Sequence, residues 1–283
     1  TLLSYPAPSL RSACLTMKSL LTHLLSLAPL AVWMMPLAAT ATVFAADRSS
    51  TDLRCYELRI YQAAPGKRND LIERFRAHTD RLFARHGIER LGYWVPVDAA
   101  DNALVFLLAY PSRAEREARW NAFKNDPEWQ AAQKASEANG PLVSKSESIL
   151  LSATDYSPAI TAAANNPERV FELRTYKTNP GRLAALNARF RDHTVALFSK
   201  HGMTHIGYWM PLDAAKGSDD TLIYLLAHAS REAAAESFKA FRADPAWIAA
   251  REASEKAAGG SLTVQPGGVR SQFLRPLEFS PLR

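Results

Sequence analysis

The pattern of hydrophobic and polar positions divides the chain into short strands and amphipathic helices. Alternating apolar and polar residues predict strands, and apolar residues three or four apart predict helices. One strand, at residues 104–110, is apolar at nearly every position, which indicates burial on both faces. At Asp126-Pro127 the aspartate can cap a new helix whose first position suits proline. Residues 54 to 152 thus predict a strand (54–62), a helix (67–86), two strands (89–97, 104–110), a broken helix (112–138) and a strand (144–152).

The same succession of elements then occurs a second time. The matching segments are CYELRIY (55–61) with VFELRTY (170–176), FRAHT (75–79) with FRDHT (190–194), GYWVP (92–96) with GYWMP (207–211), DPEW (126–129) with DPAW (244–247), and DYSP (155–158) with EFSP (278–281). Such agreement indicates a duplicated module. We therefore predict one repeat at residues 53–153, a linker rich in Ala, Asn and Pro at 154–168, and a second repeat at 169–281.

The order of elements within each repeat predicts the fold. Strand, helix, strand, strand, helix, strand is the split βαβ ferredoxin-like plan, a four-stranded antiparallel sheet with both helices on one face. One face of each sheet is then bare, and two such sheets can cover each other. The sequence therefore predicts an α+β protein whose two tandem ferredoxin-like repeats form a pseudo-symmetric α+β barrel within one chain, with the helices outside.

The stretch before the first repeat resembles a secretory signal. Met17 is the first methionine, Lys18 supplies a positive charge, and residues 20–37 form a largely apolar run. Val43-Phe44-Ala45 has the small-x-small pattern of a cleavage site, so cleavage is expected near Ala45. The mature protein would then be periplasmic or secreted, with no stable membrane anchor.

Other readings of this leader, residues 1–45, remain open. Cleavage after residues 39–41 fits nearly as well, and the apolar run approaches the length of a membrane anchor. Two prolines and a histidine in or beside that run argue against an anchor. Residues 1–16 are interpreted as an upstream extension or a translation-start artefact.

Composition narrows the classes of protein. The chain has 283 residues, 47% of them hydrophobic, which excludes a disordered, charge-dominated polymer. Its net charge is +6, from 34 basic against 28 acidic residues. Loss of the leader removes Arg11 and Lys18 and leaves +4. The basic residues are interleaved with acidic ones, so we expect no nucleic-acid partner. Of the two cysteines only Cys55 lies outside the leader, so an internal disulfide is not expected in the mature chain.

The repeated motifs resemble those of the NIPSNAP family. They are the Tyr/Phe-Glu-Leu-Arg-x-Tyr strand, Pro-Gly, Phe-Arg-x-His-Thr, His-Gly-(x)4-Gly-Tyr-Trp and Asp-Pro-x-Trp, and they span nearly all of residues 53–280. The resemblance implies membership of the dimeric α+β barrel group, which also holds cofactor-free monooxygenases and haem-binding chlorite dismutases. It implies no established reaction, because the family has none. Eukaryotic members are mitochondrial and tied to interaction roles, whereas this chain carries a bacterial-type export signal.

His78 and His193 are the candidate catalytic residues. Each follows a phenylalanine by three positions and precedes a leucine by four, so each is expected to point toward the sheet. A neutral imidazole there could act as a base or a metal ligand. The alternative is a core histidine that is hydrogen-bonded to a backbone carbonyl or to the adjacent threonine.

The first strand of each repeat supplies candidate ligand-binding residues. Three polar residues alternate with an apolar set, and if the apolar set faces the helices, the polar set faces the other sheet. Buried charges must be paired, so these residues predict either a Glu–Arg network that joins the halves or a polar cavity that binds an anionic or polar ligand. The polar residues are Glu57, Arg59 and Tyr61 in the first repeat and Glu172, Arg174 and Tyr176 in the second.

Two aromatic pairs complete the candidate ligand site. Tyr93-Trp94 and Tyr208-Trp209 lie on strands, so one ring of each pair should face the helices and the other the barrel. They serve either as core or as the wall of a pocket for an aromatic or lipid-like ligand.

The sequence leaves several functions open. It contains no glycine-rich phosphate loop, CxxC, HExxH or Gly-x-Ser-x-Gly motif, and we assign no metal and no cofactor. The first hypothesis is a binding or interaction protein with a small apolar or polar organic ligand. The second is a cofactor-free monooxygenase or isomerase with a helix histidine as base, and a third is haem binding. A homo-oligomer is also possible, through sheet edges or helices.

Overall fold

All predicted elements are present in the computed structural model, which describes residues 52–98, 100–160 and 169–283. The predicted leader, and residues 161–168 of the predicted linker, lie outside the described residues. In the first repeat the elements are β1 (Cys55–Ala63), α1 (Arg68–Arg74), the π-helical turn η1 (Phe75–Thr79), α2 (Asp80–Arg85), β2 (Glu89–Pro96), β3 (Ala103–Tyr110), α3 (Arg113–Lys124), α4 (Pro127–Ser136) and β4 (Val143–Ala153).

The second repeat has the same elements and one extra 3-10 turn. They are β5 (Val170–Lys177), α5 (Leu183–Arg189), the π-helical turn η2 (Phe190–Thr194), α6 (Val195–Lys200), β6 (Thr204–Pro211), the 3-10 turn η3 (Ala214–Lys216), β7 (Thr221–His228), α7 (Arg231–Ala243), α8 (Pro245–Ala257) and β8 (Val269–Pro276). Within the described ranges, no helix combines the length and the apolar character needed to span a bilayer.

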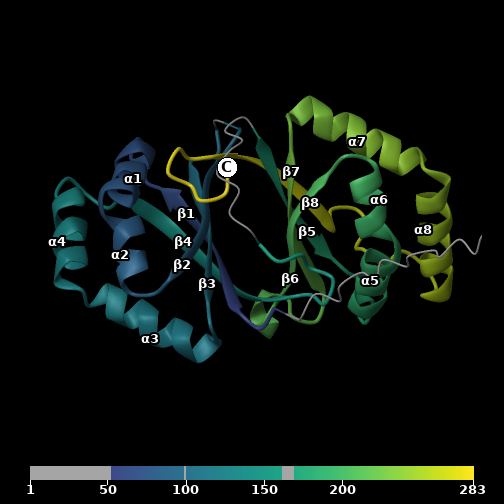
Figure 1. Ribbon diagram of the computed structural model, residues 1–283, viewed down its shortest axis with the longest axis horizontal. Helices are drawn as coiled ribbons and strands as arrows, with labels where there is room; N and C mark the ends of the chain where they lie inside the picture. The colour runs from purple at the N-terminus through teal and green to yellow at the C-terminus, as the bar shows by residue number, and fades with distance from the viewer. Residues whose placement is uncertain (1–51, 99, 161–168) are drawn as a thin grey trace, which may run out of the picture. The chain divides into compact units, whose positions relative to one another are not determined.

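The eight strands close into one antiparallel barrel. The first repeat contributes the order β4-β1-β3-β2 and the second β8-β5-β7-β6, as the ferredoxin-like plan requires. Short ladders between β2 and β8 and between β4 and β6 join the two sheets. Helices α1–α4 lie outside one sheet and α5–α8 outside the other (Figure 1). The predicted intrachain α+β barrel is therefore confirmed.

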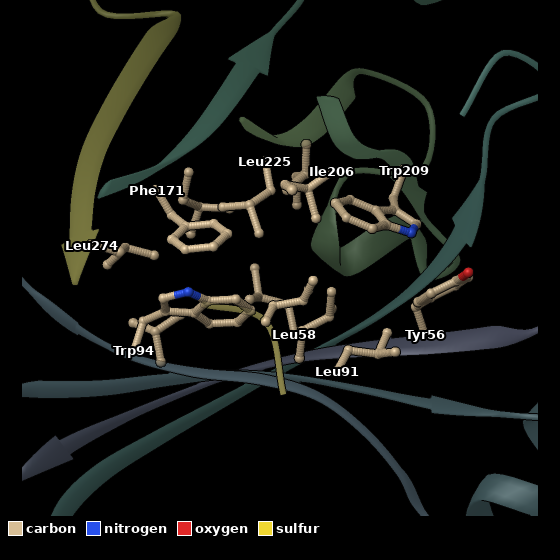
Figure 2. Packing of buried hydrophobic residues seen from close by; sticks show 14 of the residues in the cluster. Tyr56, Leu58, Leu91, Trp94, Phe171, Ile206, Trp209, Leu225 and Leu274 are labelled. Atoms are coloured by element: carbon tan, nitrogen blue, oxygen red, sulfur yellow. The ribbon is translucent and has the colours of Figure 1, made fainter. Parts of the chain in front are cut away.

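Apolar side chains from both repeats fill the barrel interior. Trp94 packs against Phe171 with ring centroids 5.4 Å apart, and its counterpart Trp209 packs against Tyr56 at 5.6 Å. Figure 2 shows these two pairs with Leu58 between them. The space left among them is about 10 Å³, roughly the volume that one water needs. The interior is therefore a packed core.

The Gly-Tyr-Trp motif has a steric explanation. Residues two apart on a strand share a face, and the ring of Trp94 folds back over Gly92. A Cβ at Gly92 would overlap that ring, and the same holds for Gly207 beneath Trp209. A glycine two positions before the tryptophan therefore makes room for the largest side chain of the core.

The repeated Ser-Pro segments that follow β4 and β8 are exchanged between the repeats. Ser157, after β4, accepts a hydrogen bond at 3.0 Å from the backbone N–H of Tyr208 in the second repeat. Ser280, after β8, accepts the equivalent bond at 2.9 Å from the N–H of Tyr93 in the first. Each repeat thus fastens its own end onto the other, in addition to the shared core.

We expect Gly92→Ala to lower the free energy of unfolding by about 2 kcal/mol, because the added methyl group overpacks the interior against Trp94. In the Trp94→Phe background, whose smaller ring leaves the methyl group room, the same change should cost less than about 1 kcal/mol. Urea denaturation of the four proteins of this double-mutant cycle checks the expectation. Equal costs in both backgrounds would contradict the steric explanation.

Candidate functional site

The polar residues of β1 and β5 face the helices, so the prediction that they face the other sheet is wrong. Tyr56 and Leu58 belong to the interior cluster, whereas Glu57, between them in sequence, contacts Arg116 of α3. The closed interior is filled mainly by apolar side chains, while the helix layer brings polar partners of its own. The first repeat therefore has no Glu–Arg network between the two sheets at these positions.

Glu57 is fully buried and neutralised by side chains of its own repeat. It accepts hydrogen bonds from Arg59 at 2.6 Å, Ser148 at 2.6 Å, Tyr110 at 3.0 Å, and Arg116 at 2.6 and 3.1 Å. Burial alone would raise the pKa of Glu57, but the hydrogen bonds from Arg116 and the charge of Arg59 lower it below its ordinary value. The network therefore fastens α3 to the sheet.

The second repeat compensates its own buried glutamate with different residues. Glu172 is buried and accepts hydrogen bonds from Arg174 and Ser271, and it lies 3.1 Å from Nε2 of His228. The position of Tyr110 is taken here by His228, and that of Arg116 by Ala234. Sequence reasoning missed Arg116 and His228. The repeats share the buried Glu, its Arg and its Ser, but they differ at the positions of Tyr110 and Arg116. That difference was the available signal in the sequence.

A pocket of about 480 Å³ lies between the sheet and the helices of the first repeat. Its walls carry the rings of Tyr61, Phe75, Phe83, Trp120, Phe123 and Trp129. Its charged lining residues are Arg59, Arg74, Lys124, Lys145 and Glu137. The size falls within the range of small-molecule sites, and the lining combines apolar walls with a few polar groups, as such sites do.

The two buried arginines of this pocket rest on tryptophan rings. The guanidinium carbon of Arg59 lies 4.0 Å from the ring centroid of Trp120, and that of Arg74 lies 5.2 Å from Trp129. Cation–π contact of this kind stabilises an arginine where water is scarce. Of the predicted ligand residues, the pocket therefore brings together Arg59 and Tyr61. Sequence reasoning missed Arg74 and both tryptophans as pocket residues.

Helix α4 is placed by a histidine on the neighbouring helix. Asp126 caps α4 through hydrogen bonds from the N–H groups of Glu128 and Trp129, and its second oxygen lies 2.7 Å from Nε2 of His86. The hydrogen bond from His86 and the bonds from these N–H groups lower the pKa of Asp126 to about 2, although partial burial opposes them. The predicted cap is thus confirmed. It holds the start of α4, and with it Trp129, against α2.

His78 and His193 do not face the sheet, contrary to the prediction. The π-helical turn that contains each of them inserts an extra residue, which rotates the face that regular helical spacing predicts. The buried position goes to the next residue: Thr79 donates to the carbonyl of Arg74 at 3.3 Å, and Thr194 to that of Arg189 at 3.2 Å.

Both histidines instead border outer grooves between helices. His78 is half-buried in a groove of about 400 Å³ between α1–η1 and α4, and its Nδ1 has no hydrogen-bond partner within the described part of the chain. His193 is exposed beside the corresponding groove of about 360 Å³. Neither is therefore the predicted core histidine.

The aromatic pairs divide between the two sides as predicted. Tyr93 and Tyr208 face the helices, where Tyr93 donates to Asp80 at 2.9 Å and Tyr208 contacts His205. Trp94 and Trp209 face the packed interior. These tryptophans are therefore core residues, and none of the four residues borders the 480 Å³ pocket.

The lining of the pocket does not suit haem. Among its described lining residues there is no histidine, cysteine or methionine to ligate the iron, and the hydroxyl of Tyr61 is occupied by a hydrogen bond from Arg59 at 3.0 Å. The nearest sequence candidate, His78, borders the outer groove instead. The residues present thus fit an organic ligand better than a metal porphyrin.

The fold defines a class, the α+β barrels built from two ferredoxin-like units. The NIPSNAP family model matches residues 56–158 and 171–281, more than half of the chain, and the chain belongs to the NIPSNAP family with two tandem domains. A human relative, Protein NipSnap homolog 3A, is 28% identical over 195 residues, which cover 69% of this chain and 71% of the relative.

Likeness also extends to a protein of another organism and to a solved structure. The Protein NipSnap homolog of Dictyostelium discoideum is 27% identical over 136 residues, or 47% of this chain. The match spans about half, 53%, of that relative's length. A crystal structure of a monooxygenase-like protein from Lactobacillus acidophilus aligns with a TM-score of 0.52 and 11% identity, covering 82% of this chain and 98% of the other. This last likeness shows the fold alone.

We expect His193→Gln to change the free energy of unfolding by less than about 0.5 kcal/mol, because the exposed ring of His193 makes little contact. Thr194→Val, of the same shape, should cost about 1 kcal/mol, because the buried carbonyl of Arg189 loses the hydrogen bond from Thr194. Urea denaturation measures both. A larger loss of stability in His193→Gln would support the alternative that His193 is a core histidine.

We expect Arg116→Gln to cost about 3 kcal/mol of stability at pH 7, because the variant leaves Glu57 buried with one cation fewer. The pKa of Glu57 is lowered by folding, so its contribution to stability is present at neutral pH and is lost as pH falls below the ordinary glutamate pKa of about 4.3. The difference between variant and wild type should therefore shrink below that pH. Denaturation between pH 3 and 7 checks this, and a constant difference would contradict it.

Proposed function

We propose that this protein binds a small organic molecule with a planar, apolar body in the pocket of its first repeat. The observation that supports this most directly is the pocket itself, about 480 Å³ walled by six aromatic side chains. Aromatic walls favour flat, unsaturated ligands, because offset and edge-on contacts add to the burial of apolar area.

The barrel interior and the outer grooves are less suited to a ligand than this pocket. The barrel interior leaves only about 10 Å³, too little for an organic molecule. A reaction with His78 or His193 as base would need substrate in the outer grooves, since neither histidine borders the aromatic pocket. Binding in the aromatic pocket is therefore the function that these residues favour. Export through the leader of residues 1–45 stays a prediction from the sequence.

The pocket is bordered on one side by the start of β4. Ser144, Lys145 and Ser146 of that strand are exposed and also line the pocket, so its entrance lies beside them. A bulky residue introduced there should obstruct the pocket without disturbing the core. Val269 occupies the corresponding strand position of the second repeat, since it lies opposite Tyr176 as Ser146 lies opposite Tyr61. It is likewise exposed and offers a matched control.

We expect naphthalene-2-carboxylate, a flat aromatic probe, to bind the mature chain with a dissociation constant below about 1 mM in isothermal titration calorimetry. Ser146→Trp should weaken this binding at least about tenfold by filling the entrance, whereas Val269→Trp should leave it unchanged. Native mass spectrometry of protein from its own host would identify the natural ligand. The proposal is wrong if no binding is detected, or if Ser146→Trp binds like the wild type.

A further inference from the structure

The charged lining of the pocket is strongly unbalanced. Four cationic side chains, Arg59, Arg74, Lys124 and Lys145, border it against one carboxylate, Glu137. Glu137 is already paired with Arg74 through Nη1 at 2.8 Å. Arg59 and Arg74 are buried, so water screens their pull on an anion less, whereas Lys124 and Lys145 are exposed at the edge of the pocket. The pocket is therefore suited to a negatively charged ligand.

The two buried arginines differ in what they have left to donate. Arg59 is 8% exposed and directs Nη1 to Glu57 and Nη2 to Tyr61, at 2.6 and 3.0 Å. Both of its terminal nitrogens are therefore engaged, and only its Nε–H is buried without a partner within the described part of the chain. Its charge is balanced by the fully buried Glu57. Arg59 thus belongs to the network that fastens the sheet to α3.

Arg74 has one edge of its guanidinium free. It is 5% exposed, and its hydrogen bonds, to Ser136 and Glu137, both leave from Nη1. Its Nε–H is buried without a partner within the described part of the chain. Nε–H and Nη2–H lie along the same edge of the planar group, and this edge is the one that a carboxylate binds through two parallel hydrogen bonds.

The π-helical turn follows Arg74 directly and lies against the pocket. Thr79 of that turn satisfies the carbonyl of Arg74, and Arg74, Phe75 and Thr79 all border the pocket. The ring of Trp129 lies against the guanidinium of Arg74 and also lines the pocket. An aromatic ligand could therefore stack beside Trp129 while its acidic group meets the free edge of Arg74.

We propose that the ligand is an aromatic carboxylate and that Arg74 binds its carboxylate group through Nε–H and Nη2–H. This inference rests on the proposed function and names the class of its ligand. A carboxylate would satisfy the buried donor that folding leaves without a partner, whereas an uncharged amide of the same shape offers that edge only one oxygen.

The test compares naphthalene-2-carboxylate with naphthalene-2-carboxamide by calorimetry on the mature chain. The carboxylate should bind at least about tenfold more tightly. Arg74→Gln should bring the two affinities within about twofold of each other, and Arg74→Lys should give an intermediate ratio, because lysine keeps the charge but not the two parallel donors. Arg189→Gln, the corresponding change in the second repeat, should keep the wild-type ratio.

The outcomes distinguish a failure of the carboxylate inference from a failure of the proposed ligand binding. The ratio of the two affinities cancels any loss of binding that both probes share, so a changed ratio in Arg74→Gln is due to the lost charge. Equal affinity of the wild type for both probes overturns the carboxylate class and leaves the pocket in place. A preference for carboxylate that survives in Arg74→Gln overturns the role of Arg74. If neither probe binds, the proposed function fails and this inference with it.

Discussion

The dry interior that the two sheets share is the constraint on which the rest of the structure depends. Side chains from both repeats fill it, and the remaining space is about that of one water. A polar group there would find neither solvent nor a free backbone partner, and burying it would be costly. Each sheet therefore presents a largely apolar face inward. Because side chains alternate along a strand, this requirement also sends Glu57, Arg59 and Tyr61 together to the helix side.

The charged side chains of β1 and β5 are thereby confined to the layer between sheet and helices. The strand fixes a buried glutamate and its arginine in both repeats, and the helices and neighbouring strands supply what remains. In the first repeat a second arginine comes from α3, and in the second a histidine comes from β7 while α7 carries Ala234 instead. Partner groups can thus change as long as the buried charge stays compensated. In the same layer of the first repeat, aromatic and basic side chains line a pocket.

The fold was predictable because its signals are local and occur twice. Periodicity identified the strands and helices, and the recurrence of Gly-Tyr-Trp and Asp-Pro-x-Trp identified the repeats. Alternation tells which residues share a face, but it cannot tell which face turns inward when both faces are covered, and β1 was therefore assigned the wrong way round. Helical spacing assumes about 3.6 residues per turn, so the π-helical turns displaced both histidines. The pocket joins Arg74, Trp120 and Trp129 from three helices, and only the recurrence of the first and third as Arg189 and Trp247 gave a signal.

Because the two units are fused in one chain, the shared interior can stay symmetric while the two helix layers differ. The interior is symmetric, since Trp94 on Phe171 mirrors Trp209 on Tyr56, and the exchanged serines repeat the pattern at its edges. A change there disturbs both sheets. In a dimer of identical subunits every change on the helix side would also occur twice. In this chain it occurs once, and the pocket residues Trp120 and Gln133 correspond to Phe238 and Arg251 in the second repeat. The core can therefore keep its stability while one helix layer alone acquires a site.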